Sequence, residues 1–459
     1  MKLWSATSAC GALLAARLAG ALELNIDDNE SIKQAASTVA FEMVSYYYGN
    51  ESNGIPGLLG DPYYWWEAGA MFSSLIDYWY YTGNSEYNEI TTQAMLHQRG
   101  AHMDYEPENQ TKSLGNDDQA FWGMAAMTAA EVGYPDPPDD QPGWLALAQA
   151  VFNRQAERWD NETCAGGLRW QIFPFNNGYD YKNSITQGSF FNIAARLYAY
   201  TGNETYAEWA TKTFEWSQQV GLISNAYQVF DGTDSAINCS DLNHIQWSYN
   251  TGVYMLGAAM LFNKTEGQTQ EYWRTHVQGL LDGARFFFYE NTNIMFEIAC
   301  EPRMNCNVDQ QSFKAYLARW MAGTAKVAPF THDSIYERLR ASAVAAAKQC
   351  SGGETGVTCG TRWYEGAWDG TYGVGQQMNA LEVFQSNLGD LVPGPLSNST
   401  GGTSRGNPAA GTGAENSGGG GGGRAGASNP ITTGDRAGAG ILTALVVVFV
   451  LGGAWWMVA

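Results

Sequence analysis

Basic residues are scarce in this chain. Its 459 residues include 25 Lys and Arg against 46 Asp and Glu, which gives a formal net charge of −21 at pH 7. Phosphate backbones repel such an acidic protein, so we expect no nucleic-acid partner. The charge fits a soluble protein whose partner is uncharged or cationic.

Metal-ligand patterns are missing as well. The five histidines include no pair at helical spacing, and the cysteines form no Cys-x-x-Cys motif. Zinc sites usually depend on such spacing. We therefore expect neither a metal ion nor another cofactor.

Strand-like alternation is also rare. From about residue 23 to residue 396, apolar residues recur at steps of three and four, which is the pattern of amphipathic helices. No Gly- or Pro-rich linker interrupts this stretch. The sequence therefore predicts one all-α domain over residues 22–396.

A repeated phrase gives the period of these helices. Residues 81–87 (YTGNSEY) resemble residues 200–206 (YTGNETY), which start 200 − 81 = 119 positions later, and further turns fit a helix hairpin about every 60 residues. About six hairpins then fill the domain. Because no repeat with a polar outer face is evident, we predict closure into an (α/α)6 toroid; an open solenoid is the alternative.

The two ends read as processing signals. Residues 1–21 have a basic start, an apolar run and a small-residue exit, which is typical of a secretory signal peptide. Residues 397–436 are rich in Gly, Ser and Thr and are expected to form a flexible stalk. The apolar tail 437–459 has no basic residue after it, so we predict a GPI signal with attachment near Gly426 rather than a transmembrane anchor.

Secretion would expose the chain to glycosylation and oxidation. Eight Asn-x-Ser/Thr sequons begin at Asn29, Asn50, Asn109, Asn161, Asn203, Asn238, Asn263 and Asn398. Once Cys10 leaves with the signal peptide, six cysteines allow 15 pairings. Local closure would join Cys300 to Cys306 and Cys350 to Cys359, which leaves Cys164 with Cys239.

Long loops between the hairpins carry aromatic and polar residues together. Aromatic residues make up 13% of the chain, and their faces either hold sugar rings or fill cores. Five polar-aromatic loops, around residues 60–67, 103–118, 166–187, 231–250 and 361–370, recur with the hairpin period. We expect them to emerge on one face of the domain and to form a binding cleft.

Asp117 and Asp118 stand in one of these loops, at the start of a long apolar helix. Acidic residues favour helix starts, so the pair could be a simple cap. Glycoside hydrolysis, however, needs two carboxyl groups in opposite protonation states. Their position among aromatic loops favours catalysis, and Gly115 would supply backbone freedom at the helix entrance. Glu365 and Asp369 form the rival carboxylate pair.

Other residues of these loops are candidates for substrate binding, although core packing would explain them equally well. The candidate sugar platforms are Trp66, Trp122, Trp247 and Trp363. The candidate hydroxyl-binding residues are Glu67, Asn116, Gln119, Gln187, Asp231, Asn250 and Asp369.

Several long motifs resemble one known family. They are residues 64–70 (YWWEAGA), 115–123 (GNDDQAFWG), 166–171 (GGLRWQ) and 246–250 (QWSYN). The chain resembles glycoside hydrolase family 76 from about residue 24 to 391, and within it the fungal GPI-anchored cell-wall proteins. The resemblance implies an (α/α)6 barrel and endo-1,6-α-mannosidase activity. It also implies Asp117 as nucleophile and Asp118 as general acid/base of a retaining mechanism.

The resemblance further implies a role in the cell wall. Such a protein would sit on the outer face of the plasma membrane, cleave the mannose core of GPI anchors and transfer it to β-1,6-glucan. Plain hydrolysis of α-1,6-mannan is the alternative. A non-catalytic wall-glycan-binding or structural protein is disfavoured because both aspartates are present.

Overall fold

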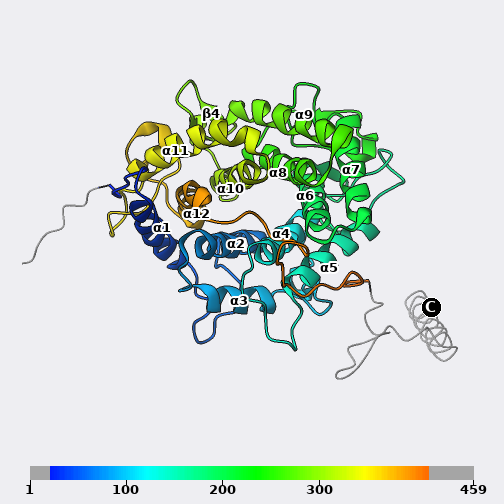
Figure 1. Cartoon of the computed structure of the whole chain (residues 1–459), viewed down its shortest axis with the longest axis horizontal. Coiled ribbons are helices and arrows are strands. Elements are labelled where there is room, and N and C mark those ends of the chain that lie inside the picture. The colour runs from blue at the N-terminus through cyan, green and yellow to red at the C-terminus, as the bar shows by residue number, and fades with distance from the viewer. Residues whose placement is uncertain (1–20, 413–459) are drawn as a thin grey trace, which may run out of the picture. The chain divides into compact units, whose positions relative to one another are not determined.

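The computed structural model describes residues 21–412 of the chain. Within this range twelve α-helices alternate between an outer and an inner position (Figure 1). The inner helices are α2 (Trp65–Thr82), α4 (Asn116–Glu131), α6 (Ser184–Thr201), α8 (Ser248–Lys264), α10 (Phe313–Val327) and α12 (Val374–Gln385). The outer helices are α1 (Asn29–Val44), α3 (Asn88–His97), α5 (Trp144–Glu157), α7 (Glu204–Gln219), α9 (Gly267–Gly283) and α11 (His332–Gln349).

The inner helices form a closed ring. Each packs against the next inner helix along the chain, and α12 returns to pack against α2. Figure 1 shows the outer helices surrounding this ring. The predicted (α/α)6 barrel is therefore confirmed, and the open solenoid is excluded.

The repeated YTGN phrase ends two inner helices. Gly83 and Gly202 are the C-caps of α2 and α6, with φ of 78° and 72°, a left-handed conformation that glycine adopts without steric cost. After the second turn, the Asn203 side chain accepts a hydrogen bond from the Thr205 amide and caps α7. The phrase thus encodes the sharp turn between an inner and an outer helix.

Short elements occur in the connections between the helices. Five short strands form two antiparallel sheets, one with the order β1-β2-β3 and one that pairs β4 with β5. The strands are β1 (Tyr181–Asn183), β2 (Gly232–Asp234), β3 (Leu242–Asn243), β4 (Phe288–Tyr289) and β5 (Ile294–Met295). The 3-10 helices are η1 (Glu108–Gln110), η2 (Ser235–Ile237), η3 (Ala284–Phe287), η4 (Glu301–Arg303), η5 (Gln310–Ser312), η6 (Pro329–Thr331), η7 (Trp363–Glu365) and η8 (Ser386–Leu391).

Three disulfides lie in the long loops that lead from outer to inner helices. Cys164–Cys239 joins the loop before α6 to the loop before α8. Cys300–Cys306 and Cys350–Cys359 close short turns before α10 and α12. This is the pairing expected from local closure. All three cross-links restrain the same set of loops.

The first residues of the predicted stalk lie against the domain. Residues 397–412 pack along the domain, where the Asn398 amide donates to the Tyr200 carbonyl at 2.9 Å and the Asn153 side chain donates to the Ala410 carbonyl at 2.8 Å. The Arg405 amide also donates to Asp136 Oδ2 at 3.1 Å. Gly- and Ser-rich composition shows that a segment cannot build a core, but not whether its backbone finds partners on a neighbouring surface. We refer to residues 397–412 as the C-terminal strap.

The remaining terminal predictions fall outside the described residues. These are the signal peptide, the stalk from residue 413, Gly426 and the apolar tail. Between residues 21 and 412, no helix is both long and apolar enough to cross a bilayer. All eight sequon asparagines lie in this range and are exposed, as glycosylation would require.

Candidate active site

The long connections all lead into the N-terminal ends of inner helices, so their side chains gather at one end of the ring. The sequence singled out five of them, and the structure adds a sixth, residues 284–312 before α10. In the ring the six connections surround the entrance to the barrel. This arrangement makes the N-terminal end of the ring the candidate site.

Asp117 and Asp118 occupy the first turn of α4. The Gly115 amide donates to Asp118 Oδ2 at 2.6 Å, and the Asp118 amide donates to Asp117 Oδ1 at 3.0 Å. The entrance of the helix is held in place by the Asn116 amide, which donates to the Trp170 carbonyl at 2.8 Å. Both carboxyl groups therefore cap the helix and still line a cavity.

Gly115 has a different role from the one expected. Its φ of −94° is open to any residue, so backbone freedom is not the reason for glycine here. A Cβ at this position would lie 2.3 Å from Asp117 Oδ1. Glycine is needed because it leaves room for that carboxylate.

The surroundings give the two carboxyl groups different acidities. Burial raises the pKa of Asp117 to about 7, while hydrogen bonds from the Asp118 amide and from the Asn183 and Trp170 side chains favour its charged form. Burial and the neighbouring charge of Asp117 raise the pKa of Asp118 well above its usual range. Of the two groups, Asp117 therefore loses its proton more readily, and Asp118 holds its proton more strongly.

Two adjoining compartments open beside the aspartates. The Asp231 compartment, about 750 Å³, is lined by Trp66, Asp117, Asp118, Phe121, Trp170, Tyr181, Asn183, Ile185, Asp231, Tyr249, Asp309 and Phe313. The Asn177 compartment, about 990 Å³, is lined by Tyr64, Trp65, Trp66, Gln110, Lys112, Ser113, Leu114, Asp118, Trp170, Gln171, Asn176, Asn177 and Asp309. Trp66, Asp118, Trp170 and Asp309 line both, so the compartments form one continuous cleft.

Two of the predicted binding residues face this cleft. Trp66 lines both compartments, and Asp231 lines the one that we name after it. The Tyr181 hydroxyl donates to Asp231 Oδ2 at 2.5 Å, and the Trp247 side chain also hydrogen-bonds this carboxylate. Trp247 therefore supports Asp231 and packs on Phe313, but it does not line the cleft itself.

Two predicted sugar platforms lie in the core instead. The Trp122 ring is fully buried and stacks between Trp65 and Tyr105, with centroid distances of 5.2 and 5.6 Å. The Trp363 ring is also buried, with the Lys314 ammonium 4.1 Å from its centroid. Neither indole face is open to a ligand.

The predicted amides hold loops rather than ligands. Buried Gln187 bonds both the amide and the carbonyl of Leu168, at 2.9 and 2.7 Å. The Asn116 side chain donates to the Arg169 carbonyl at 2.9 Å, and Gln119 donates to the Asp104 carbonyl at 2.8 Å. The bonds of Gln187 and Asn116 position the loop that carries Trp170, and the bond of Gln119 holds the loop before α4, so the amides act on the site indirectly.

Glu67 and Asn250 are buried without lining either compartment. Neither side chain makes a hydrogen bond to another described residue. Burial, reinforced by the negative charge of Asp309, raises the pKa of Glu67 well above its usual value. Burial thus disfavours the charged form of Glu67, and the side chain does not reach the cleft as a hydroxyl-binding group would.

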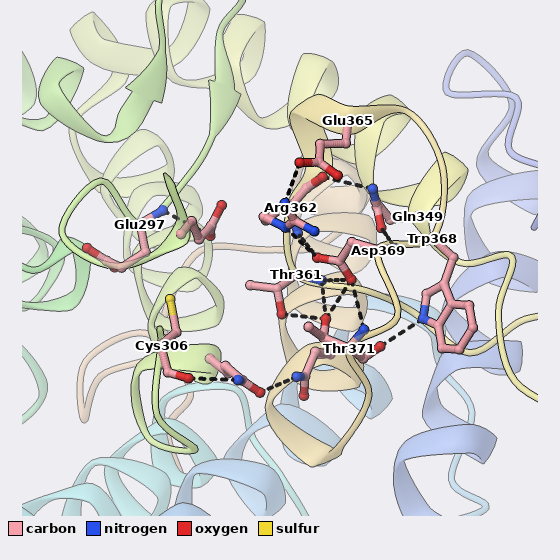
Figure 2. Close-up of polar contacts among 12 residues, drawn as sticks. Glu297, Cys306, Gln349, Thr361, Arg362, Glu365, Trp368, Asp369 and Thr371 are labelled. Carbon is pink, nitrogen blue, oxygen red and sulfur yellow. Dashed lines mark hydrogen bonds and ion pairs between the residues drawn. The ribbon is translucent and has the colours of Figure 1, made fainter. Parts of the chain in front are cut away.

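The rival pair, Glu365 and Asp369, is neutralised by a cation. Figure 2 shows Arg362 bound to both carboxylates. Asp369 also accepts hydrogen bonds from the Thr371 hydroxyl at 2.7 Å and the Arg362 amide at 2.9 Å. Although burial opposes ionisation, these bonds hold the pKa of Asp369 below its usual value. It fixes this loop and does not bind substrate in the cleft.

The sequence missed one acidic residue of the cleft. Asp309 lines both compartments and accepts a hydrogen bond from Trp66 Nε1 at 3.2 Å. Burial raises its pKa to about 6. The hairpin period could have found it, because a ring with five such loops must have a sixth before α10.

Neutral side chains of the cleft were also missed. Trp170 lies within a quoted motif, but its position in the cleft depends on the loop fold around it. Tyr181, Asn183, Tyr249 and Phe313 likewise reach the Asp231 compartment from four different positions in the chain. In the part of the chain that the structure describes, no cluster of His, Cys, Asp or Glu is arranged to hold a metal ion.

Comparison with known proteins places this architecture in a family. The model of glycosyl hydrolase family 76 matches residues 31–399. The mannan endo-1,6-alpha-mannosidase DCW1 of Eremothecium gossypii is 48% identical over 446 residues, which cover 95% of each chain. The mannan endo-1,6-alpha-mannosidase DFG5 of Saccharomyces cerevisiae is 42% identical over 439 residues, covering 95% of this chain and 94% of the relative.

Solved structures agree with the fold. The crystal structure of Dfg5 from Chaetomium thermophilum in complex with glucosamine superposes with a TM-score of 0.81 at 48% identity, covering 84% of this chain and 97% of that one. An inactive variant of an α-1,6-mannanase of Salegentibacter, in complex with α-1,6-mannotriose, superposes with a TM-score of 0.61 at 17% identity, covering 78% and 99%. The chain forms a ring of six helix hairpins with a tandem aspartate pair at its entrance, and the family model matches most of its length. The chain therefore belongs to glycosyl hydrolase family 76.

Proposed function

We propose that this protein is a retaining glycosidase that acts within chains of α-1,6-linked mannose. The observation that carries the proposal is the tandem pair at the entrance of α4, which lines the cleft. Hydrogen bonds favour the charged form of Asp117, while burial and the charge of Asp117 raise the pKa of Asp118 well above its usual range. Retaining glycosidases need these two states in close proximity. The curated relatives, named as mannan endo-1,6-alpha-mannosidases, indicate the substrate.

Each aspartate has a defined step. Asp117 attacks the anomeric carbon and forms a covalent glycosyl ester, while Asp118 gives its proton to the departing sugar oxygen. Asp118 then removes a proton from the incoming hydroxyl, whose oxygen displaces Asp117. The hydrogen bonds from Asn183 and Trp170 to Asp117 lower its pKa and partly offset the effect of burial, which favours the charged form that the nucleophile needs.

Substitution of either aspartate tests this assignment. We expect Asp117→Asn and Asp118→Asn each to lower the turnover of α-1,6-mannotetraose by about 10²-fold or more, because each removes one proton-transfer or nucleophilic function. Helical circular dichroism should be unchanged, since the amide can still accept the capping hydrogen bonds. Turnover close to wild type in either variant would refute the assignment.

We further propose that the physiological reaction is transfer. In this reaction, the donor is the mannose core of a GPI anchor and the acceptor is a hydroxyl of β-1,6-glucan. The predicted signal peptide, the predicted GPI tail near Gly426 and the sequons support this proposal, because together they would direct such a protein to the outer face of the plasma membrane. The acidic Asp231 compartment would also suit the amine of an amino sugar, and the Dfg5 relative was crystallised with glucosamine.

Product analysis distinguishes transfer from hydrolysis. The protein is incubated with a GPI-core mannoside and β-1,6-glucan, and the products are separated by mass. Transfer predicts a mannoside linked to glucan. Free mannoside alone would show that the protein is an endo-α-1,6-mannanase, the second candidate.

A further inference from the structure

A separate cavity lies at the other end of the ring, away from the aspartates. It has a volume of about 670 Å³ and is lined by residues toward the C-terminal ends of α2, α4, α6, α8 and α10 and by the segment that follows α12. It shares no lining residue with either compartment of the cleft. We call this cavity the far-end pocket.

Two aromatic rings lie between the far-end pocket and the cleft. Trp320 lines the far-end pocket, and Phe121 lines the Asp231 compartment. Their ring centroids are 6.5 Å apart, and the Trp320 ring also packs on Tyr316 at 5.9 Å. A molecule in the far-end pocket would therefore be distinct from a sugar in the cleft.

Most charged groups of the far-end pocket are already paired. Glu131 pairs with Arg196, with 2.5 Å between Oε2 and Nη2. Asp77 pairs with Arg319, with 2.7 Å between Oδ2 and Nε, and Arg319 also pairs with Glu382 behind the wall. A charged ligand that recruited one of these groups would have to break a buried ion pair, which is costly.

Two polar groups of the pocket have donors to spare. The Tyr81 hydroxyl makes no hydrogen bond to another described residue. The Lys326 ammonium donates to the Gly389 carbonyl at 2.8 Å and has no carboxylate partner between residues 21 and 412, so two of its three hydrogens are free. Both groups can donate to an acceptor oxygen of a ligand.

The surroundings of Lys326 do not favour an anion as that ligand. The carboxylates of Asp77 and Glu131 line the same pocket, and the C-terminal ends of five helices point toward it. A cation is disfavoured as well, because Lys326 and two arginines also line the pocket. The balance of charges suits a neutral molecule.

The rest of the wall is apolar. Leu256 and Met260 of α8, Trp320 and Val327 of α10 and Pro395 after η8 all line the pocket. Such a wall favours a ring or a short alkyl chain over a hydroxyl-rich sugar, whose many polar groups would lose their hydration without finding partners.

We propose that the far-end pocket is a second binding site, which takes a small neutral molecule with an apolar body and one acceptor oxygen. Tyr81 and Lys326 would hold the oxygen, and the apolar wall would hold the body. This site does not rest on the proposed glycosidase activity.

Three probes that share one ring test the charge of the ligand. They are 4-fluorobenzyl alcohol, which is neutral, 4-fluorobenzoate, which is an anion, and 4-fluorobenzylamine, which is a cation at pH 7. The fluorine NMR signal of each probe is followed while the protein is added. We expect the alcohol to bind with a dissociation constant on the order of 1 mM, and the two ions to bind at least about tenfold more weakly.

Substitutions in the pocket locate the bound probe. Tyr81→Phe and Lys326→Met each remove one donor and should weaken binding of the alcohol about fivefold, as expected for the loss of one hydrogen bond. Val392→Trp adds a large side chain to the lining and should abolish binding. Tyr48→Phe and Lys264→Met, at exposed residues outside the pocket, are the matched controls and should bind like wild type.

Each outcome decides the proposal. Helical circular dichroism shows which variants are folded, and Tyr81→Phe keeps its ring, so at least this variant should fold normally. Stronger binding of either ion than of the alcohol would overturn the neutral ligand class. No binding of the alcohol at about 10 mM, or equal binding by the pocket variants and wild type, would overturn the site. None of these results depends on turnover, so the proposed function stands or fails separately.

Discussion

At the scale of single residues, Asp117 and Asp118 both cap a helix and line the candidate active site. The carboxylates of Asp117 and Asp118 accept hydrogen bonds from backbone amides at the start of α4, as acidic capping residues usually do. The same geometry places them side by side in a buried cleft, where like charges cannot both ionise easily. Helix capping and catalysis are therefore compatible roles of one pair.

The sequence could identify these two residues but not all their neighbours. Tandem carboxylates in a polar-aromatic loop are visible without a structure. Which tryptophan faces the cleft is not visible in the same way, because Trp122 and Trp170 both lie in motifs shared with the family, yet Trp122 is stacked in the core and Trp170 lines both compartments. Burial of an indole is set by contacts between distant segments, and local sequence does not encode them.

Asp309 leads to a prediction about pH dependence. Its negative charge adds to the causes that raise the pKa of Asp118, after burial and Asp117. Asp309→Asn removes that charge, so the pKa of Asp118 should fall. Because Asp118 must be protonated to act as the acid, the alkaline limb of the kcat/KM profile should move to lower pH.

A pH profile of the variant with α-1,6-mannotetraose measures this shift. Asp390→Asn, at an exposed residue near the C-terminal end of α12, is the control and should leave the profile unchanged. An alkaline limb that stays in place in Asp309→Asn, or that moves to higher pH, would show that Asp309 does not influence the acid.

At the scale of secondary-structure elements, the structure differs from the sequence-based predictions in the loops rather than in the helices. The helices follow from three- and four-residue spacing, and the YTGN phrase marks two of their ends. The loop before α10 was missed because its aromatic residues lie at 286–296, whereas residues 297–312 around Asp309 contain none. The packing of the C-terminal strap could not be predicted because its composition resembles that of a linker. The residues that it hydrogen-bonds, such as Asn153 and Asp136, lie 257 and 269 residues earlier in the chain.

The strap leads to a prediction about stability. The Arg405 guanidinium donates to the carbonyls of Pro137 and Pro138 at 2.7 and 3.0 Å, which ties the strap to the loop after α4. Arg405→Ala should lower the free energy of unfolding by roughly 1 kcal/mol, a modest value because the side chain is partly exposed. It should not alter turnover, since the strap contacts the end of the barrel away from the aspartates.

Urea denaturation and limited proteolysis measure the effect. The strap should become cleavable in Arg405→Ala while the barrel stays resistant. Arg285→Ala, which removes an exposed pair with Asp282 at 3.0 Å, is the control and should change the stability little. Equal stability and equal protease resistance of Arg405→Ala and wild type would mean that the strap does not depend on this arginine.

At the scale of the whole described domain, closure of the ring gives the site its form. Arg319 on α10 pairs with Asp77 on α2, with 2.7 Å between Nε and Oδ2, and also with Glu382 on α12. The helices that close the ring are thus tied by one largely buried cation. Five of the six connections then contribute side chains to a single cleft, which an open solenoid would spread along an edge. The repeat period predicted six hairpins, and the lack of a repeat with a polar outer face favoured closure over a solenoid. The ion network that accompanies closure could not be predicted from spacing.

The central claim is that Asp117 forms a covalent bond to the sugar, and the stereochemistry of the first product tests it most directly. The protein is mixed with α-1,6-mannotetraose in deuterated buffer, and the anomeric proton of the new reducing end is followed by NMR before mutarotation. A double displacement predicts that the α configuration appears first. Initial release of the β anomer would contradict the account, because it would require direct attack by water and leave Asp117 without a nucleophilic role.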